Sequence, residues 1–535
     1  MKALKALILA SVLLLGGCSQ FAGEPIESTS DIVPVQTEST AATSDTQPSV
    51  TESTTLPSYS EVEIGEVVID PQDYSLLVEA EEGALSGYAA AVSRGEGYSG
   101  SGYVTGLSLP DSRVTLTFPI ESPAHYSITV CAAAQEEVSV VLVVDGYPRG
   151  RLYFEGDGSF EAVKLENVYL SPPESIITLS EPSGELELDF VLVESSDEVY
   201  SVDYSLPGTL SFSSRSQNTV RLYRYLCELY GETVLTAQQC TQGSNEEITA
   251  IANATGRYPA IRFGELMGYS SGEDTGDIEL SIEYWQEGGL VGYVWNWLQN
   301  GSLELSESGF DLSAAVTAHD VARLSQSRLN QLLSTGGISP ECLCLIQEID
   351  LIAEQLKRLK ELDIPVIFRP LPVASGGQFW WGCDKESYLW LYRLVYDRLN
   401  HYHMLDNLIW VWNAQDPDWY VGDEYCDIIS ADIYDFSKGQ WDNQSHINPL
   451  LRLLEISNDK PCAISECNVL PGPANIARDK AYWLYASVWS GEYAIDGDGG
   501  LFCGYISREE WILFYNCSQT TARDELSLSF RSDSN

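Results

Sequence analysis

From about residue 205 onward, short apolar runs alternate with segments that have helical periodicity. In the clearest unit, apolar residues recur at helical spacing between Ile346 and Leu359, and an apolar run follows at once. Such continuous runs are typical of strands buried on both faces of a parallel sheet. They lie at 364–368, 408–412, 427–434 and 462–466. This alternation predicts a (β/α)8 TIM barrel in 205–535, with functional side chains at the carboxyl ends of its strands.

Residues 65–196 have a different pattern, in which apolar and polar residues alternate with period two. The runs 114–118 and 138–144 are examples, and turn pairs such as Asp145-Gly146 separate them. No long stretch here has helical period. We therefore expect a multidomain chain in which a β-sandwich precedes the barrel.

The first 64 residues are expected to stay outside both domains. Residues 1–18 combine Lys2 and Lys5 with an apolar stretch too short to span a bilayer. The stretch ends in Leu-Gly-Gly-Cys, which resembles a bacterial lipobox and implies a lipoprotein signal peptide, lipidation of Cys18 and anchoring to the bacterial membrane at the cell surface. An ordinary signal peptide with a chance cysteine is the alternative. Residues 19–64 are rich in Ser and Thr and predict a disordered linker.

The charge of the chain narrows the class of partner. The net charge is −49 and no basic patch stands out, so a nucleic acid is not expected as a partner. Strong acidity repels anionic polymers but leaves neutral polysaccharides unaffected. Aromatic residues make up 11% of the chain, which suits carbohydrate faces and large β-rich cores equally well.

Residues 369–382 read Arg-Pro-Leu-Pro-Val-Ala-Ser-Gly-Gly-Gln-Phe-Trp-Trp-Gly. The string resembles the end of the fourth barrel strand in glycoside hydrolase family 26, the β-mannanases. Further strings match that family in order and spacing; they lie at 238–239, 254–256, 258–261, 284–289, 407–413, 427–434, 464–466 and 521–526. The resemblance implies a (β/α)8 barrel that acts on plant β-mannan or a related neutral β-glycan.

The same resemblance assigns a catalytic pair of which one member is missing. Retaining glycosidases use two carboxylates about 5 to 5.5 Å apart, a nucleophile and an acid/base. By resemblance Glu466 is the nucleophile, and the family His-Glu pair is Pro372-Val373 here. A valine side chain can neither donate nor accept a proton, so hydrolysis is expected to be weak or lost. Glu466 could instead be a relic or a surface carboxylate.

A carboxylate on a later loop could replace the missing acid; the candidates are Asp416, Asp418, Glu424 and Asp435. Residues at strand ends are expected to bind substrate; they are Trp295, Asn296, Trp297, Arg369, Trp380, Trp381, Trp412, Asn413 and Tyr434. Core packing is the alternative for each tryptophan. Asn296, Ser375 and Gln378 stand where the family has His, Asn and an aromatic residue. Glu265 matches an acidic family position after an early strand.

Three strings in 65–196 resemble the jelly-roll carbohydrate-binding modules of families 35 and 6; they lie at 78–81, 97–104 and 188–191. The resemblance implies a structural calcium held by Glu79, Glu81 and Asp189, because carboxylate oxygens suit a hard cation. Glu79 and Glu81 could instead face solvent on an edge strand. Tyr98 and Tyr103 stack on sugar or belong to the core. No cofactor is expected for catalysis.

Two functional hypotheses follow. In the first, the protein is a mannan-directed hydrolase that uses Glu466 and an unrecognised acid. In the second, it is a non-catalytic pseudoenzyme that captures polysaccharide for partner enzymes. The family resemblance favours the first, and Pro372-Val373 favours the second. A purely structural surface protein is a third reading.

Overall fold

The computed structural model describes residues 56–535 except 66, 110, 436–443, 528 and 530–535. The expected signal peptide, Cys18 and most of the expected linker therefore lie outside the described residues. The end of that linker, residues 56–64, packs on the barrel. The Val62 N–H donates to the Asn516 carbonyl at 2.7 Å, and the Ser518 N–H donates to the Val62 carbonyl at 3.1 Å. The last residues of the expected linker thus pair with the barrel through backbone hydrogen bonds.

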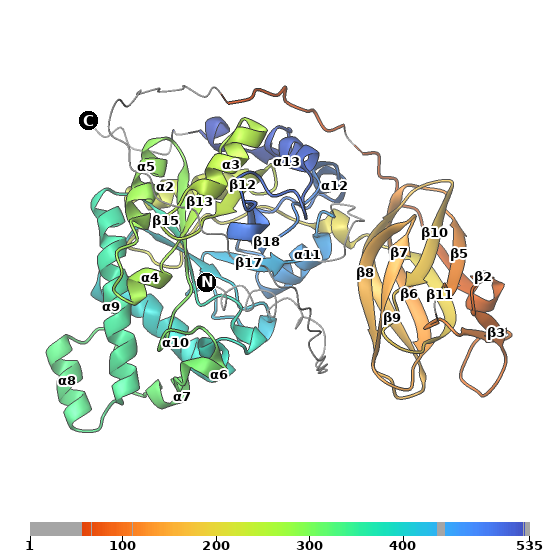
Figure 1. Cartoon of the computed structure of the whole chain (residues 1–535), viewed down its shortest axis with the longest axis horizontal. Helices are drawn as coiled ribbons and strands as arrows, with labels where there is room; N and C mark the ends of the chain where they lie inside the picture. Colours follow the sequence, from red (N-terminus) through yellow and green to blue (C-terminus); the bar gives the residue numbers. More distant parts are fainter. Residues whose placement is uncertain (1–55, 66, 110, 436–443, 528, 530–535) are drawn as a thin grey trace, which may run out of the picture.

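Within the expected module, the strands between Ser75 and Ser195 form two antiparallel sheets that share one apolar core (Figure 1). One sheet has the order β3-β4-β11-β6-β9, with β1 paired to β11, and the other has the order β2-β5-β10-β7-β8. Alternate residues of each strand point inward, as in β7, where Val138, Val140, Leu142 and Val144 are buried. The predicted strands of this region are confirmed. Their bounds are β1 Ser75–Glu79, β2 Ala84–Ser86, β3 Ala90–Val92, β4 Tyr103–Thr105, β5 Arg113–Pro119, β6 Ala124–Ala133, β7 Val138–Val144, β8 Tyr147–Phe154, β9 Phe160–Leu170, β10 Glu174–Ser180 and β11 Glu187–Ser195.

Eight parallel strands of the C-terminal region close into a barrel, which confirms the predicted fold. The order is β13-β14-β15-β16-β17-β18-β19-β12, and β12 also pairs with β13. Nearly every strand residue is buried, as expected for strands covered on both faces. The bounds are β12 Val234–Gln239, β13 Ile261–Glu265, β14 Leu290–Trp295, β15 Val366–Pro370, β16 Leu408–Trp412, β17 Ile428–Ile433, β18 Cys462–Cys467 and β19 Tyr485–Val488, with a short β20 Thr520–Thr521 beside β12.

Helices surround the barrel, and α9 is the longest of those described (Figure 1). It begins after Ser339, whose hydroxyl accepts from the Cys342 N–H, and Pro340 occupies its first turn. Its buried face carries the apolar residues whose spacing predicted it. The α-helices are α2 Gln217–Leu229, α3 Glu246–Thr255, α4 Met267–Ser270, α5 Asp277–Gln286, α6 Leu305–Ser308, α7 Leu312–Ala315, α8 Gln326–Ser334, α9 Pro340–Glu361, α10 Lys385–Asp397, α11 Ile447–Ile456, α12 Pro473–Asp479 and α13 Arg508–Tyr515.

Short helical turns complete the described elements. They are η1 Ala80–Glu82, η2 Glu198–Ser201, η3 Ala374–Gly376, η4 Trp380–Gly382, the π-helical η5 Arg398–Tyr402, η6 Pro417–Trp419, η7 Gly491–Tyr493 and η8 Arg523–Glu525. Within the described residues, no helix has the length and apolar character needed to cross a membrane.

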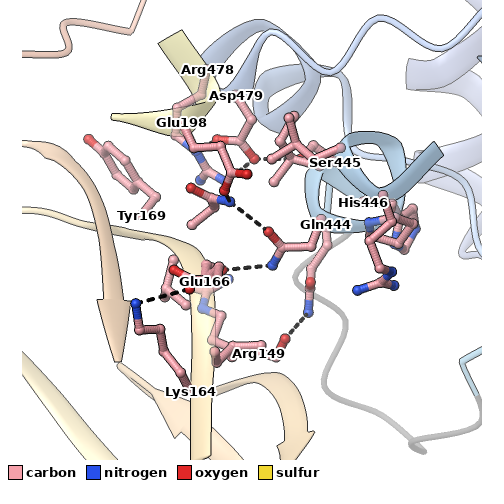
Figure 2. A pocket seen from close by; sticks show the side chains of 18 of the residues that line it. Arg149, Lys164, Glu166, Tyr169, Glu198, Gln444, Ser445, His446, Arg478 and Asp479 are labelled. Carbon is pink, nitrogen blue, oxygen red and sulfur yellow. Dashed lines mark hydrogen bonds and ion pairs between the residues drawn. The ribbon is translucent and has the colours of Figure 1, made fainter. Parts of the chain in front are cut away.

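The two-sheet module contacts the barrel through buried polar groups. His125 of β6 is buried, and its Nε2 lies 2.8 Å from Asp479 Oδ1 at the end of α12. Burial opposes the charge of Asp479, but hydrogen bonds from His125 and Arg478 lower the pKa of this carboxyl to about 2. A cavity of about 460 Å³ lies beside this contact (Figure 2). Among the residues that line it, Asn167 Nδ2 donates to Asn448 Oδ1 at 3.0 Å. None of the barrel-mouth residues described below lines this cavity.

Candidate functional site

Glu466, at the carboxyl end of β18, is the centre of a hydrogen-bonded group at the barrel mouth. The residue is 7% exposed. Oε2 accepts from the Tyr434 hydroxyl at 2.9 Å, and Oε1 forms an ion pair with Nη2 of Arg369 from β15. Burial and the charge of Glu466 raise the pKa of Tyr434 well above its usual value, which keeps the hydroxyl a donor. Both carboxylate oxygens of Glu466 are therefore held in place.

Arg369 also reaches a second buried carboxylate, Asp432 of β17. Its Nη1 lies 3.2 Å from Asp432 Oδ1, which also accepts from Asn413 Nδ2 at 3.0 Å. Burial and the nearby charge of Glu466 raise the pKa of Asp432 well above its usual value, although Arg369 opposes this. One guanidinium thus serves two carboxylates, and Asp432 Oδ2 has no hydrogen-bond partner among the described residues. Asp432 was not among the predicted site residues. Asp432 lies two residues before Tyr434 at the end of a strand, so both side chains point to the same face. This spacing could have identified Asp432 from the sequence.

Glu265, at the end of β13, is a third carboxyl group at the mouth and is 8% exposed. Asn296 donates twice to it, from Nδ2 to Oε2 at 2.6 Å and from its backbone N–H to Oε1 at 3.1 Å. The Met267 N–H donates to Oε1 at 3.0 Å. Burial raises the pKa of Glu265 to about 7 despite these hydrogen bonds. The expected sugar contact Asn296 is thus already engaged by Glu265.

Val373 occupies a strained backbone position directly after β15. Its φ is 54° and its ψ is 34°, in the left-handed region that a β-branched residue rarely adopts. Leu371 also has a positive φ, of 52°. The loop is held by hydrogen bonds to the end of β16, from the Val373 N–H to the Asn413 carbonyl at 2.7 Å and from the Ser375 N–H to the Ala414 carbonyl at 3.2 Å. No side chain between residues 371 and 378 can titrate near neutral pH.

The four loop carboxylates considered as replacement acids lie after β16 and β17. Asp416, Asp418 and Glu424 are exposed. Asp416 Oδ1 caps η6 by accepting from the Asp418 N–H at 2.9 Å. Asp435 is half-buried, and its N–H donates to Asn468 Oδ1 at 2.8 Å. Glu265 is more deeply buried at the mouth than any of these four carboxyl groups.

The tryptophans expected to stack on sugar are core residues in this structure. All have 0% exposure; they are Trp295, Trp297, Trp380, Trp381 and Trp412. Trp295 and Trp297 stack on each other with centroids 4.2 Å apart. Trp380 Nε1 donates to the Trp297 carbonyl at 2.6 Å, and Trp381 Nε1 donates to the Pro372 carbonyl at 2.9 Å. These rings pack under the loops that follow β14 and β15, and none has an exposed face on which a sugar could stack.

In the two-sheet module, Glu79, Glu81 and Asp189 gather around the loop at Ser99 and Ser101. Ser99 Oγ donates to Glu79 Oε2 at 2.7 Å, the Ser99 N–H donates to Asp189 Oδ1 at 2.9 Å, and the Ser101 N–H donates to Glu81 Oε1 at 3.0 Å. Burial raises the pKa of Glu79, and the charges of Asp189 and Glu81 add to this while Ser99 opposes it. Over the part of the chain that is described, no group of three or more His, Cys, Asp or Glu residues is arranged so that it could hold a metal ion.

Tyr98 and Tyr103 lie beside this loop with ring centroids 5.4 Å apart. Tyr103 is buried and packs on Phe160 at 5.5 Å, whereas Tyr98 is half-buried. Tyr103 thus belongs to the edge of the core, and Tyr98 has the larger open surface.

Comparisons with known proteins match both the sequence and the fold. The chain is 31% identical over 433 residues to mannan endo-1,4-beta-mannosidase of Thermothelomyces thermophilus, covering 78% of this chain and 85% of that protein. It is 27% identical to mannan endo-1,4-beta-mannosidase B of a Piromyces species, covering 78% and 72%. The crystal structure of the GH26-CBM35 beta-(1,4)-mannanase of Podospora anserina superposes with a TM-score of 0.55 at 28% identity, over 86% of this chain and all of that one.

A ruminal GH26 endo-beta-1,4-mannanase, at 22% identity, shares the fold with a TM-score of 0.58, over 86% of this chain and all of that one. The family model described as Glycosyl hydrolase family 26 matches residues 212–503, more than half of the chain. The chain therefore belongs to glycosyl hydrolase family 26.

Proposed function

We propose that this protein binds β-mannan, or a closely related neutral β-glycan, at the barrel mouth and hydrolyses it weakly or not at all. Membership of family 26 and the mannan endo-1,4-beta-mannosidases among its relatives support the ligand class. The observation that carries the proposal is Val373, an apolar side chain where the family resemblance places the acid/base. The net charge of −49 favours a neutral polymer over an anionic one.

The chemistry explains why a nucleophile by itself does not suffice. Glu466, the proposed nucleophile, has its carboxylate oxygens fixed by Arg369 and Tyr434. The departing sugar oxygen must gain a proton in the same step, and general acid catalysis is typically worth 10²–10⁴-fold. Val373 supplies no proton. A natural glycosidic bond has a poor leaving group, so its cleavage suffers most from this loss.

The barrel mouth still offers polar groups that suit sugar hydroxyls. The carboxyl groups of Glu265 and Asp432 accept hydrogen bonds, and Asp432 Oδ2 has capacity beyond its partners in the described chain. Asn413 and Arg369 hold the carboxyl group of Asp432, and Asn296 holds that of Glu265. Polar groups held by buried partners lose little freedom on binding, which favours capture of a polysaccharide chain.

The two-sheet module is proposed to be a jelly-roll carbohydrate-binding module with a structural calcium at Glu79, Glu81 and Asp189. Its similarity to the GH26-CBM35 beta-(1,4)-mannanase of Podospora anserina supports the assignment. Converging like charges, and a buried Glu81 Oε2 with no partner among the described residues, fit a hard cation. Tyr98 is the more accessible sugar contact. A chelator should lower the melting temperature of the protein, and an unchanged melt would reject the metal site.

Lipidation at Cys18 is proposed to hold the protein at the cell surface, where captured glycan passes to partner enzymes. A Cys18→Ser variant should be released into the medium. Equal retention of that variant in the membrane fraction would count against the anchor.

The decisive test of function combines binding with product analysis. Titration calorimetry with β-1,4-mannohexaose should show binding, while long incubation with galactomannan, glucomannan, β-1,3/1,4-glucan and xylan should release few new reducing ends. No binding of any β-linked oligosaccharide would remove the proposal. Rapid cleavage that Glu466→Gln abolishes would show that the protein is an enzyme with another acid.

A hydrolase with a replaced acid is the second candidate function, and Glu265 is the observation that favours it. Its carboxyl group has a pKa of about 7, which suits a general acid near neutral pH. If mannan is cleaved, Glu265→Gln should then reduce the rate by at least about 10². Cleavage that persists in Glu265→Gln would point to a loop carboxylate instead.

A further inference from the structure

Gln378 is a polar residue in an unusual environment beside the position of the missing acid/base. Its side chain is half-buried, and both amide atoms, Oε1 and Nε2, are shielded from solvent. Neither atom has a hydrogen-bond partner among the described residues. Burying an amide without a partner costs on the order of 1–3 kcal/mol, and most buried polar groups in proteins are paired. A group in this state calls for an explanation other than stability.

The position of Gln378 connects it to Val373. A Cβ built on Gly376 would lie 2.5 Å from Gln378 Oε1 and 3.5 Å from Val373 Cγ1. The amide of Gln378 and the side chain of Val373 thus flank the same point of the loop after β15. The backbone of Gln378 is held on the other side, where its carbonyl accepts from the Leu305 N–H at 2.7 Å. The main chain of Gln378 is therefore fixed, while its side-chain amide makes no hydrogen bond within the described chain.

The next loop along the mouth repeats this arrangement. Gln415 follows β16 and has a φ of 76°. Its Oε1 accepts from the Asp432 N–H at 3.2 Å, whereas its Nε2 has no partner within the described part of the chain. Hydrogen bonds from Val373 and Ser375 join this loop to the one that carries Gln378. Positive φ angles and side-chain amides without a partner in the described chain therefore occur together in these two neighbouring loops. Backbone strain of this kind clusters at functional sites.

We infer that Gln378 is a ligand-contact residue, whose amide turns toward a bound neutral glycan and hydrogen-bonds its hydroxyl groups next to the vacated acid/base position. A primary amide offers a donor and an acceptor side by side, which matches two neighbouring hydroxyl groups of a pyranose ring. Glutamine has three rotatable side-chain bonds, so the turn needs no movement of the anchored backbone. An amide does not transfer protons near neutral pH, so Gln378 contributes to recognition and not to bond cleavage.

This inference rests on the proposed function, and its test separates the two. Calorimetric titration of the full-length protein with β-1,4-mannohexaose measures affinity, and thermal unfolding without ligand measures stability. Gln378→Met keeps the length of the side chain and removes both hydrogen-bonding groups. We expect its affinity to fall at least five-fold, and its melting temperature to rise or stay the same because an unpaired buried amide is removed.

Gln299 provides the matched control. It lies on the loop after β14, is 3% exposed, and its amide donates to Glu348. Gln299→Met should therefore lower the melting temperature and leave the affinity unchanged. The opposite behaviour of two glutamines with shielded amides would identify Gln378 as a ligand contact.

Two outcomes would overturn the inference. One is a Gln378→Met variant that binds mannohexaose as tightly as the wild type. The other is a Gln378→Met variant that loses stability as Gln299→Met does, which would mean that an ordered water satisfies the amide. If Gln378→Met does not fold, Gln378→Glu, which keeps the shape but loses the donor, must still show weaker binding. Failure of the wild type to bind any β-glycan would instead remove the proposed function.

Discussion

The ends of strands β18 and β15 face the same barrel mouth but differ in how completely their side chains are supported. At β18, Glu466 has both oxygens satisfied by Tyr434 and Arg369, and Arg369 is itself held by Asp432 and Asn413. At β15, Val373 sits in a strained backbone conformation, and the amide of Gln378 beside it is unpaired within the described chain. The position of the proposed nucleophile thus has a partner for each carboxylate oxygen, whereas the position of the proposed acid/base carries an apolar side chain.

This difference indicates that the loss of proton transfer that we propose is confined to one loop. A general decay of the site would be expected to disturb both ends, because buried ion pairs are costly unless every member has a partner. The buried group of Arg369, Glu466 and Asp432 remains intact. The proposed loss of chemistry therefore lies in the loop after β15, whereas the ion-paired side chains Arg369, Asp432 and Glu466 keep their partners.

The largest expected effect comes from restoring an acid/base residue at the end of β15. Pro372→His with Val373→Glu should raise mannan hydrolysis by at least about 10²-fold, because a proton donor would again face Glu466. Release of reducing ends from galactomannan measures this. Adding Glu466→Gln to the double variant is the control and should abolish the gain. No gain at all would mean that the β15 loop no longer presents residue 373 to the bond.

Removing the guanidinium of Arg369, which pairs with both Glu466 and Asp432, should lower the stability of the protein. Arg369→Met would leave Glu466 and Asp432 as two buried carboxylates without a counter-charge, which typically costs about 3–5 kcal/mol. Urea unfolding at pH 7 measures the loss. Arg358→Met is a control, because Arg358 pairs with Glu279 at the surface. Equally small losses of unfolding free energy in both variants would show that Arg369 does not stabilise the two buried carboxylates.

Glu265 predicts a pH dependence of stability. Its folded pKa of about 7 lies above the ordinary value of about 4.3 for an unfolded chain. The folded protein therefore holds a proton that the unfolded chain has already lost. The stabilising contribution is full below about pH 4.3 and is lost as the pH rises to about 7, which lowers the free energy of unfolding by up to about 4 kcal/mol.

Unfolding free energies at pH 4.5, 5.5 and 7 test this prediction. Glu265→Gln should flatten the decline, whereas Glu424→Gln, on an exposed loop, should not. A slope that persists in Glu265→Gln would assign the titration to another buried carboxyl group.

The smallest expected effect concerns the strained end. Asparagine tolerates the left-handed region better than a β-branched residue does, so Val373→Asn should stabilise the protein by about 1 kcal/mol. Thermal unfolding measures this. Val373→Ile keeps the branch at Cβ and should bring no gain. A destabilised Val373→Asn would show that apolar contacts of Val373 outweigh its backbone strain.

Much of the architecture was predictable from the order of the residues. The runs at 408–412 and 462–466 predicted buried parallel strands, and such strands are what β16 and β18 are. Because all strands of a parallel barrel end at one face, the sequence also predicted that Arg369, Asn413 and Glu466 would meet. Period-two alternation in 65–196 likewise predicted strands that pack in two sheets.

Only the tertiary structure decided which groups are engaged and which are open. The sequence cannot distinguish a buried tryptophan from a stacking one, since both follow an apolar strand; Trp297 and Trp380 became core because loops distant in sequence cover them. The same holds for Asn296, whose amide is used by Glu265, and for Gln378, whose amide has no partner in the described chain. Side-chain direction at strand ends depends on contacts between separate loops. Local periodicity determines the strands, and long-range packing determines what their ends can bind.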